Sequence, residues 1–360
     1  MKTGFNKLLV AFVFLFATTP VWAVGSMIAT AAGLSGFEYF LTAFLVNMAV
    51  SAVVTKTFFN PEQPSNGLSG ASESPGNRQQ IPPATDNKIP VVYGSAYVGG
   101  AITDLSITEN NQTLYYVLSL CEVTNNGSDT ITFGDVYWGG KKCVFDSTDT
   151  YKVTGLYDPS TGLTDSAISG KLSIYLYSNG SNNPANSSTS AIALMQSSGL
   201  TYQWDSSKLM SNTAFAIIVL TYNPDAGTTG IQQTRFQVIN SRYAPGDCFL
   251  DYLQNTVYGA AIDSSQIDSA SFSVLNSYCA ESFSYTNSSG SPATQARFRF
   301  DGVIDTSKSI MDNLQDMANS CDCLIKYNEI LGKWGVITQK PSYSVVMDLN
   351  DSNMVSAIQI

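Results

Sequence analysis

The segment 214–222, AFAIIVLTY, is apolar on both of its alternating faces, and it constrains the fold more than any other stretch. A strand with two apolar faces must be covered on both sides, so we expect it at the centre of a sheet. Other runs with period-two alternation, β-branched or aromatic residues and Gly or Pro breaks accompany it. They lie at 90–93, 96–98, 112–121, 130–133, 136–138, 142–145, 171–177 and 234–240. The pattern predicts a β-rich domain over residues 89–244, folded as an antiparallel barrel or sandwich.

Three amphipathic helical segments are expected between residues 245 and 323, together with one short strand. The turn Pro245-Gly246 precedes the first helix, for which Asp247 is the expected N-cap, and Gly259 can end this helix after Tyr258. Asp268 is the expected N-cap of the second helix, and Thr306 or Ser307 that of the third. Apolar residues recur at three- and four-residue spacing within the helices: Phe249, Leu250 and Leu253; Phe272, Leu275 and Cys279; Ile310, Leu314, Met317, Ala318 and Cys321.

A β-hairpin is expected after the third helix, from strands 323–327 and 334–338. Gly332 can supply the turn conformation between them. Further strands are predicted at 345–349 and 355–360. Residues 245–360 therefore read as a helix-containing domain that ends in strands.

The first 57 residues are strongly hydrophobic, and three interpretations of them remain open. Residues 1–23 have the form of a signal peptide, with an apolar run at 8–16, and the core of a second run, 37–54, is long enough to cross much of a bilayer. The first interpretation is a cleaved signal peptide followed by a membrane anchor. The second is a hydrophobic plug that stays buried against protein, and the third is a segment that enters the host membrane. Residues 58–88, rich in Pro, Gly and Ser, form the expected flexible linker.

The chain contains no histidine, and its formal net charge is −10 without a cluster of basic residues. The missing imidazole removes the commonest general base, the Ser-His and Cys-His pairs, and imidazole metal ligation. An acidic surface disfavours tight binding to nucleic-acid phosphates, so DNA would pass without specific binding. The same acidity can also serve solubility alone.

The six cysteines are widely spaced except for the last two, and they do not form a zinc-ribbon pattern. They are Cys121, Cys143, Cys248, Cys279, Cys321 and Cys323. Several fall on the apolar faces of expected helices, which favours buried free thiols. A single disulfide, Cys121–Cys143, is the alternative.

Polar and aromatic residues offer three weak candidate sites, each of which has a simpler structural interpretation. The run 146–149, DSTD, offers oxygen ligands to calcium but lacks the glycine and terminal glutamate of a calcium loop, so we interpret it as a solvated turn. Trp204 beside Tyr202 could stack on a sugar, although core packing is the simpler role, as it is for Trp138 and Trp334. Five carboxylates could pair for glycoside hydrolysis, but no spacing singles out a pair: Glu122, Asp135, Asp205, Asp247 and Asp301. We therefore predict no catalytic, cofactor-binding or metal-binding residue and no enzyme activity.

Several segments, in order along the chain, carry a resemblance to a known family. They are IPPATDNKIPVVYGSAYVGG (81–100), DYLQNTVYGAAID (251–263), Tyr278-Cys279, GVIDTSKSIMDNL (302–314) and CLIKYNEILGKWGVITQK (323–340). These segments resemble the hub region of phage tail-tip proteins of the lambda host-specificity type. The resemblance covers most of the chain after the hydrophobic start, and it rests on the order of the segments, since none of them is a catalytic motif.

The resemblance implies a structural protein of the virion tail tip, a hub that closes the distal tail tube and takes part in host attachment and DNA passage. It implies a homotrimer that contacts the distal tail protein and the tape-measure protein, with residues 1–57 able to contact the host membrane. Proteins of this type are usually longer, so we expect either a split gene or a fibre-like part on another chain.

The expected architecture is α+β and β-rich: a hydrophobic helical arm (1–57), a flexible linker (58–88), an antiparallel β-barrel hub domain (89–244) and a mixed α/β second hub domain (245–360). The alternative is a secreted or membrane-anchored β-rich adhesin, which the signal-like start favours. A carbohydrate-active enzyme is a third hypothesis, which depends on the carboxylates named above.

Overall fold

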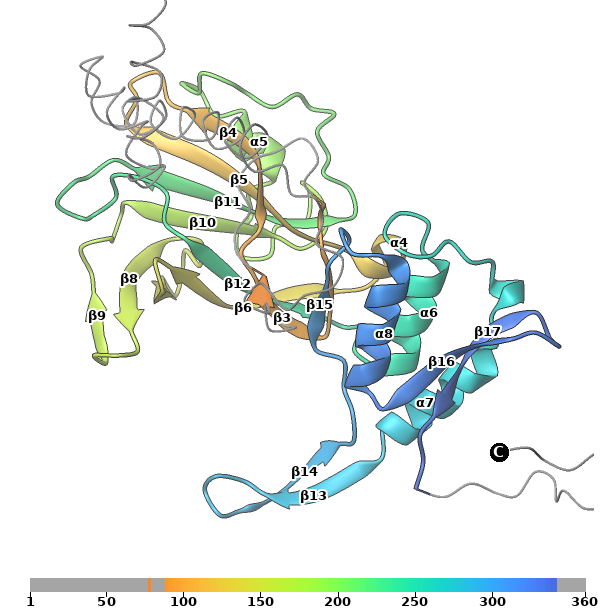
Figure 1. The fold of residues 1–360 in the computed structure, drawn as a ribbon. Helices are drawn as coiled ribbons and strands as arrows, with labels where there is room; N and C mark the ends of the chain where they lie inside the picture. Colours follow the sequence, from red (N-terminus) through yellow and green to blue (C-terminus); the bar gives the residue numbers. More distant parts are fainter. Residues whose placement is uncertain (1–76, 79–87, 342–360) are drawn as a thin grey trace, which may run out of the picture.

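The structure of the chain is a computed structural model that describes residues 77–78 and 88–341. The hydrophobic segment 1–57, most of the linker and the strands expected at 345–349 and 355–360 lie outside the described residues. The described part consists of a β-rich first portion followed by a portion that holds α6, α7 and α8 (Figure 1). The expected α+β, β-rich class is confirmed. None of the described helices is long and apolar enough to span a membrane.

The first sheet has seven strands, and its neighbours are antiparallel except for β1 and β3. Along β12 the residues alternate between buried and half-buried, as the period-two pattern predicts. The two strands expected at 130–133 and 136–138 form one strand, β6. In spatial order the strands are β1 (Asn77–Arg78), β3 (Ser95–Val98), β12 (Thr234–Asn240), β6 (Ile131–Trp138), β7 (Lys141–Phe145), β8 (Val153–Asp158) and β9 (Leu163–Asp165).

The second sheet has six strands, and β11 lies inside it between β10 and β5. Because β11 is buried along almost its whole length, the predicted central strand is confirmed. Strand β4 pairs with β5 beside the main path of the sheet. The strands are β10 (Leu172–Tyr177), β11 (Thr213–Thr221), β5 (Thr113–Glu122), β2 (Val91–Tyr93), β15 (Gly302–Ile304) and β4 (Ala101–Ile107).

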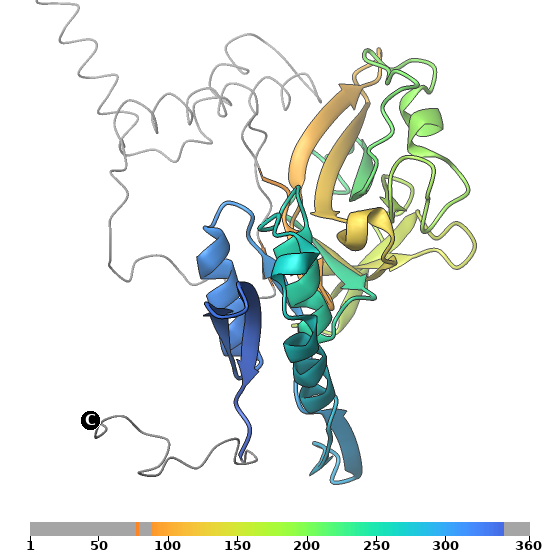
Figure 2. The same cartoon turned by 90° about the vertical axis from the view of Figure 1, so that its right-hand side faces the viewer.

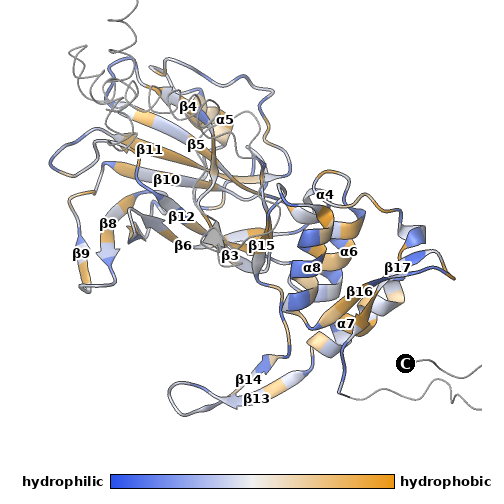
Figure 3. Cartoon of the chain, in the orientation of Figure 1, coloured by the Kyte–Doolittle hydropathy of each residue, from blue (hydrophilic) through white to orange (hydrophobic). Residues whose placement is uncertain are grey.

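The expected closed barrel is wrong, because the strands of the β-rich portion form two open sheets. Ile218 of β11 belongs to a core that also contains Val136 and Phe236 of the first sheet. Ile217, on the opposite face of β11, packs in a second cluster with Met195 of the short helix α5 (Ala191–Met195). A strand in a small barrel buries one face against the interior, whereas β11 buries both and needs a layer on each side. In Figure 3 the central strands are coloured largely hydrophobic.

The second portion packs α6 (Pro245–Gln254), α7 (Ser269–Cys279) and α8 (Ile310–Ser320) around one apolar core. Two hairpins extend from it, β13 (Ser282–Thr286) with β14 (Pro292–Ala296), and β16 (Cys323–Asn328) with β17 (Lys333–Thr338). The second hairpin was predicted, and its turn glycine, Gly332, has a φ of +64°. The first hairpin lies where the sequence indicated only a Ser/Gly-rich gap.

The ends of the helices differ from those expected. Helix α6 begins with Pro245 in its first turn, since proline lacks only an N–H that has no helical partner there. It ends at Gln254 and not at Gly259, because the Asn255 side chain accepts the next free N–H groups, those of Val257 and Tyr258. Asp268 precedes α7 as predicted, although its side chain makes no capping bond.

Helix α8 is capped by Ser309, whose Oγ accepts the N–H of Asp312 at 3.1 Å, and not by Thr306 or Ser307. Leu314, Met317 and Cys321 are buried as the periodicity predicts. Ile310 is exposed, so the buried stripe begins one turn later than expected.

All six cysteines are free and buried, which confirms the preferred interpretation of the thiols. The alternative disulfide between Cys121 and Cys143 is wrong. Cys121 lies on β5 of the second sheet and Cys143 on β7 of the first, so each thiol fills the core between the sheets as a small apolar group.

Candidate functional site: a polar junction and three projecting hairpins

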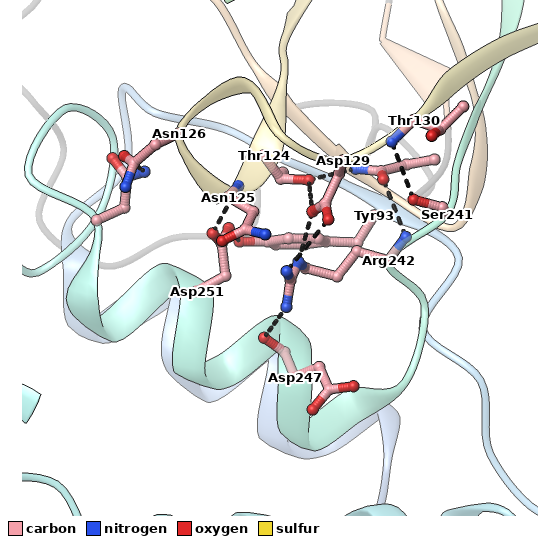
Figure 4. A network of polar contacts seen from close by, with 12 residues as sticks. Tyr93, Thr124, Asn125, Asn126, Asp129, Thr130, Ser241, Arg242, Asp247 and Asp251 are labelled. Atoms are coloured by element: carbon pink, nitrogen blue, oxygen red, sulfur yellow. Dashed lines mark hydrogen bonds and ion pairs between the residues drawn. The ribbon is translucent and has the colours of Figure 1, made fainter.

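A polar network joins the β-rich portion to α6 (Figure 4). Arg242, which follows β12, binds the carboxylate of Asp129 at two points, with Nε–Oδ2 and Nη2–Oδ1 distances of 2.6 and 3.2 Å. Its Nη1 donates to the main-chain carbonyl of Asp247 in α6 at 3.3 Å. The Arg242 and Asp129 side chains are only 18% and 13% exposed. Burial acts to lower the pKa of Arg242, but the hydrogen bond and charge of Asp129 raise it, so the guanidinium stays charged.

Asn240 extends this network into both sheets. Its amide nitrogen donates to the carbonyl of Val92 at 2.7 Å and to the hydroxyl of Thr124 at 2.8 Å. Its amide oxygen accepts the backbone N–H of Arg242 at 2.9 Å. Thr124 in turn donates to Asp129. Because each donor meets an acceptor, the buried polar groups cost little and fix one arrangement of the strands.

Asp251 is the acceptor at the helical side of the junction. Its Oδ2 accepts the hydroxyls of Tyr93 and Tyr258, each at 2.7 Å, and its Oδ1 accepts the N–H of Asn125 at 2.9 Å. Burial, together with the negative charge of Asp251, raises the pKa of both tyrosines, so they remain protonated donors. Nothing in the sequence singles out Asp251, because its partner Tyr93 lies 158 positions away and no local spacing marks the pair.

The turn that Asp251 holds is left-handed. Asn125, Asn126 and Gly127 have φ angles of +54°, +52° and +82°, inside the short element α4 (Thr124–Gly127). Left-handed backbone costs roughly 1–2 kcal/mol per non-glycine residue, and asparagine tolerates it better than most. Asn179 also secures the turn through a 2.8 Å bond to the Gly127 carbonyl. We interpret the junction as a rigid joint, since its carboxylates act as acceptors for fixed neighbours.

The five carboxylates considered for hydrolysis are spread over different elements, and within residues 88–341 no hydrogen bond joins two of them. Four bind separate neighbours: Asp135 pairs with Lys142, Asp205 accepts Ser207 N–H, Asp247 accepts the Asn276 amide, and Asp301 accepts Ser95 N–H and Arg299. Glu122 is half-buried at the end of β5, and burial raises its pKa. Their placement favours structural roles.

The run 146–149 forms a turn after β7. Asp146 Oδ1 accepts the N–H groups of Thr148 and Asp149 at 2.8 and 2.9 Å, and these bonds lower the pKa of Asp146. Asp149 pairs with Lys152. Across residues 77–78 and 88–341 no group of three or more metal-ligating side chains is assembled.

Trp204 is 2% exposed and packs against Phe215, which confirms the core interpretation. Its indole nitrogen donates to Asp104 at 2.7 Å. Tyr202 stays exposed, so the two rings do not form one platform. Trp138 is buried, and Trp334 is half-buried with its ring 5.2 Å from that of Tyr327.

Three hairpins, β8–β9, β13–β14 and β16–β17, carry exposed large apolar side chains, and their tips lie at the periphery of the fold (Figure 1). Leu163, at the β8–β9 turn, is 70% exposed, and Ile330, at the tip of β16–β17, is 95% exposed. The β13–β14 hairpin exposes Phe283 and Tyr285. Single exposed apolar residues are ordinary, but their concentration on projecting elements is typical of contact surfaces.

The base of β13–β14 is held firmly. The Arg297 guanidinium lies 4.3 Å from the ring centres of both Tyr278 and Phe283, and it pairs with Glu281 at 2.5 Å. The backbone N–H of Arg297 donates to the Glu281 carbonyl at 2.8 Å. The hairpin therefore leaves α7 at a fixed angle (Figure 2).

Comparisons with known proteins place few limits on the function. No protein-family model matches the chain. No curated protein matches it either. Among solved structures, a chain of the "Virion of native gene transfer agent (GTA) particle" is similar over 54% of this chain and 37% of that one, with 11% identity and a TM-score of 0.29. A TM-score this low does not establish a common fold, so the match identifies no function for this chain.

Proposed function

We propose that the chain is a structural subunit of a virion, the hub of a phage-type tail tip that closes the distal tail tube and takes part in host attachment and DNA passage. The observation that carries this proposal is the set of three projecting hairpins with exposed apolar side chains. The ordered segments that resemble tail-tip hubs suggest the specific role of a hub. The hairpins support assembly of the chain with other subunits.

The hairpins favour an assembled protein for a physical reason. A two-stranded sheet without a covering layer, such as β13–β14, is at best marginally stable in water. A soluble monomer also rarely presents large apolar side chains such as Ile330 at the tip of a hairpin. Covering them removes apolar area from water, worth roughly 25 cal/mol per Å². Neighbouring subunits or tail proteins would provide that cover.

The proposed mechanism is mechanical and involves no bond making. Four of the five carboxylates weighed for catalysis bind separate neighbours through ion pairs or hydrogen bonds, which supports a non-enzymatic role. A homotrimer would meet the distal tail protein and the tape-measure protein, and the net charge of −10 would let DNA pass without specific binding. Residues 1–57 would stay sheltered until they contact the host membrane.

Electron microscopy tests this function at two levels. Immunogold labelling of the particles that contain the chain should place the label at the distal end of the tail. The full chain, purified in mild detergent, should form rings of three copies around a channel. Label on the capsid, or a strictly monomeric chain at about 10 µM, far above ordinary affinities of stable assemblies, would overturn the proposal.

The adhesin alternative rests on the signal-like form of residues 1–23. N-terminal sequencing of the mature protein separates the two. Cleavage after Ala23 and display on a cell surface would favour the adhesin, whereas an intact Met1 in purified particles favours the tail hub.

A further inference from the structure

We infer that the β13–β14 hairpin of one copy docks on the β16–β17 hairpin of the next copy. This inference rests on the proposed function, because it supplies the head-to-tail contact with which a hub subunit closes its ring. The two hairpins are named here the arm (282–296) and the acceptor (323–340).

The arm has the chemistry of a surface that meets another copy. Residues 282–296 contain no charged side chain, in a chain whose net charge is −10. Phe283 and Tyr285 share one face of β13, opposite Gln295 and Ala293 of β14. Every residue of both strands except Ala293 is exposed. Identical acidic chains repel one another. Two copies can therefore approach with the least electrostatic repulsion at an uncharged, aromatic arm.

The arm also needs a partner for its own stability. It is a two-stranded sheet, and its residues belong to none of the three apolar cores of the described chain. The contacts of Arg297 fix its base but leave the strands beyond it uncovered. A neighbouring subunit would bury the aromatic face and complete the missing layer.

The acceptor offers a matching apolar surface. Leu324 and Ile337 are directly opposed across β16 and β17, and both are exposed. Ile330 and Leu331 add two exposed side chains at the tip. Within residues 88–341, β16 pairs with β17 and with no other strand, and a two-stranded sheet can gain a further strand at its edge.

Charge makes the acceptor complementary to an incoming copy. The acceptor carries Lys326, Lys333 and Lys340 against Glu329, a local charge of +2 on a protein of −10. Within the described residues, neither Lys326 nor Lys333 forms an ion pair. The acceptor as a whole is therefore basic, and it would attract the acidic body of the next copy.

The directions of the two hairpins fit a ring. Figure 1 shows the arm leaving the molecule at the lower left and the acceptor tip pointing to the right. A contact between two different surfaces of the same chain is head-to-tail, and such contacts generate rings when the rotation closes. A contact between two arms would instead stop at a two-fold pair.

Cysteine cross-linking tests the contact directly, because all six native cysteines are buried and leave a low background. Gln295→Cys places a thiol on the aromatic face of the arm, and Leu331→Cys places one at the acceptor tip. Each full-length variant is purified separately in mild detergent, and the two are mixed under mild oxidation. We expect cross-linked dimers in the mixture at least about tenfold above either variant alone, since only the mixture brings arm and acceptor thiols together.

Ser207→Cys, on an exposed loop before β11, is the matched control and should cross-link with neither variant. Association of the wild-type chain without cross-links in the mixture would refute this contact and leave the proposed function standing. A wild-type chain that never associates would refute both. Cross-linking of Gln295→Cys with itself as the main product would replace the ring contact with a two-fold one.

A charge placed in the arm gives an independent readout. Tyr285→Asp would bury an unpaired carboxylate at the contact, so association measured by analytical ultracentrifugation should weaken at least about 100-fold. Ser207→Asp should leave association unchanged, and circular dichroism verifies that both variants fold. Equal association of Tyr285→Asp and the wild type would exclude the arm from the interface.

Discussion

Gly94 separates β2 from β3 and lies against the chain segment that leads into β15. Its N–H donates to the Arg242 carbonyl at 2.8 Å, and its carbonyl accepts the N–H of Asn240 at 2.7 Å. Its φ is +62°, and a Cβ at this position would lie 2.2 Å from the carbonyl oxygen of Phe300. At the scale of single residues, the junction thus depends on a missing side chain as much as on the charged groups beside it.

Gly94→Ala should therefore destabilise the fold by more than its backbone conformation alone requires. The left-handed φ costs roughly 1–2 kcal/mol, and collision with main-chain atoms that cannot move aside brings the total to at least about 3 kcal/mol. Gly140→Ala is the control, because Gly140 has a φ of +83° with nothing within 4 Å of the added Cβ. Urea unfolding of both variants gives the two free energies, and equal losses would contradict the packing argument.

Arg242→Ala should leave Asp129 partly buried without its partner. We expect a loss of about 2–4 kcal/mol in the free energy of unfolding, because breaking a buried pair exposes the cost of the remaining charge. Lys308→Ala removes the exposed pair with Asp316 and should cost under about 1 kcal/mol. A loss at Arg242 no greater than that at Lys308 would show that the junction is not a structural joint.

The buried thiols predict a loss of stability in alkali. Burial raises the pKa of Cys143 to about 12, so the folded chain keeps a proton that the unfolded chain releases above about pH 9. Stability from this thiol is complete below that pH and falls by about 1.4 kcal/mol per pH unit above it, until the folded thiol ionises. Urea unfolding from about pH 8 to 10.5 should show a shallower decline for Cys143→Ala than for the wild type. Parallel declines would contradict the prediction.

At the scale of elements, local patterns predicted what local forces decide. Strands such as β5 and β12, the helices α6, α7 and α8 and the β16–β17 hairpin follow from periodicity over a few residues. The N-cap of α8 could not be predicted from the local sequence, since Thr306, Ser307 and Ser309 all have side chains that are able to cap a helix. One tertiary and one local contact make the choice. Thr306 donates to the distant Ile89 carbonyl, and Ser307 donates to the neighbouring Asp305, which leaves Ser309.

Sheet closure and the polar junction were also beyond local patterns. Closure of a barrel depends on which distant strands pair, and period-two alternation does not indicate the pairing partner of a strand. Arg242 and Asp129 are 113 positions apart, and no spacing rule links them. Strands β4, β8 and β9 were missed because their sequences mix polar with apolar residues at the margins of the sheets.

Ser309→Ala should cost about 1 kcal/mol, the usual loss when the hydroxyl that caps a helix is removed. Ser307→Ala, two residues earlier, should change the free energy of unfolding by less than about 0.5 kcal/mol. Thermal or urea unfolding distinguishes them. The reverse order would restore the cap position that the sequence suggested.

At the scale of the whole molecule, the chain combines a body with two-sided cores and slender elements that project from it. The cores pack β11 on both faces and α6, α7 and α8 around a separate centre. The hairpins expose large apolar side chains to solvent, where these side chains do not stabilise a monomer by burial. This division of roles suits a subunit whose body is rigid and whose edges make the contacts.

Deletion of residues 1–57 tests the proposed sheltered segment. The shortened chain should still form trimers, because the projecting hairpins are intact, but particles that contain it should fail in genome ejection or tail assembly. Electron microscopy and infectivity measurements follow the two effects separately. Infectivity equal to that of the wild type would refute a role for the segment in delivery.

Strand β15 also affects how the chain is made. It pairs with β2, Gly302 opposite Tyr93, across the boundary expected between residues 244 and 245. Translation at about 5–20 residues per second leaves β2 waiting roughly 10–40 s for this neighbour to leave the ribosome. During that interval the sheet presents an open edge to other nascent chains, so slowing of synthesis beyond residue 244 should raise the fraction of chains that misassemble.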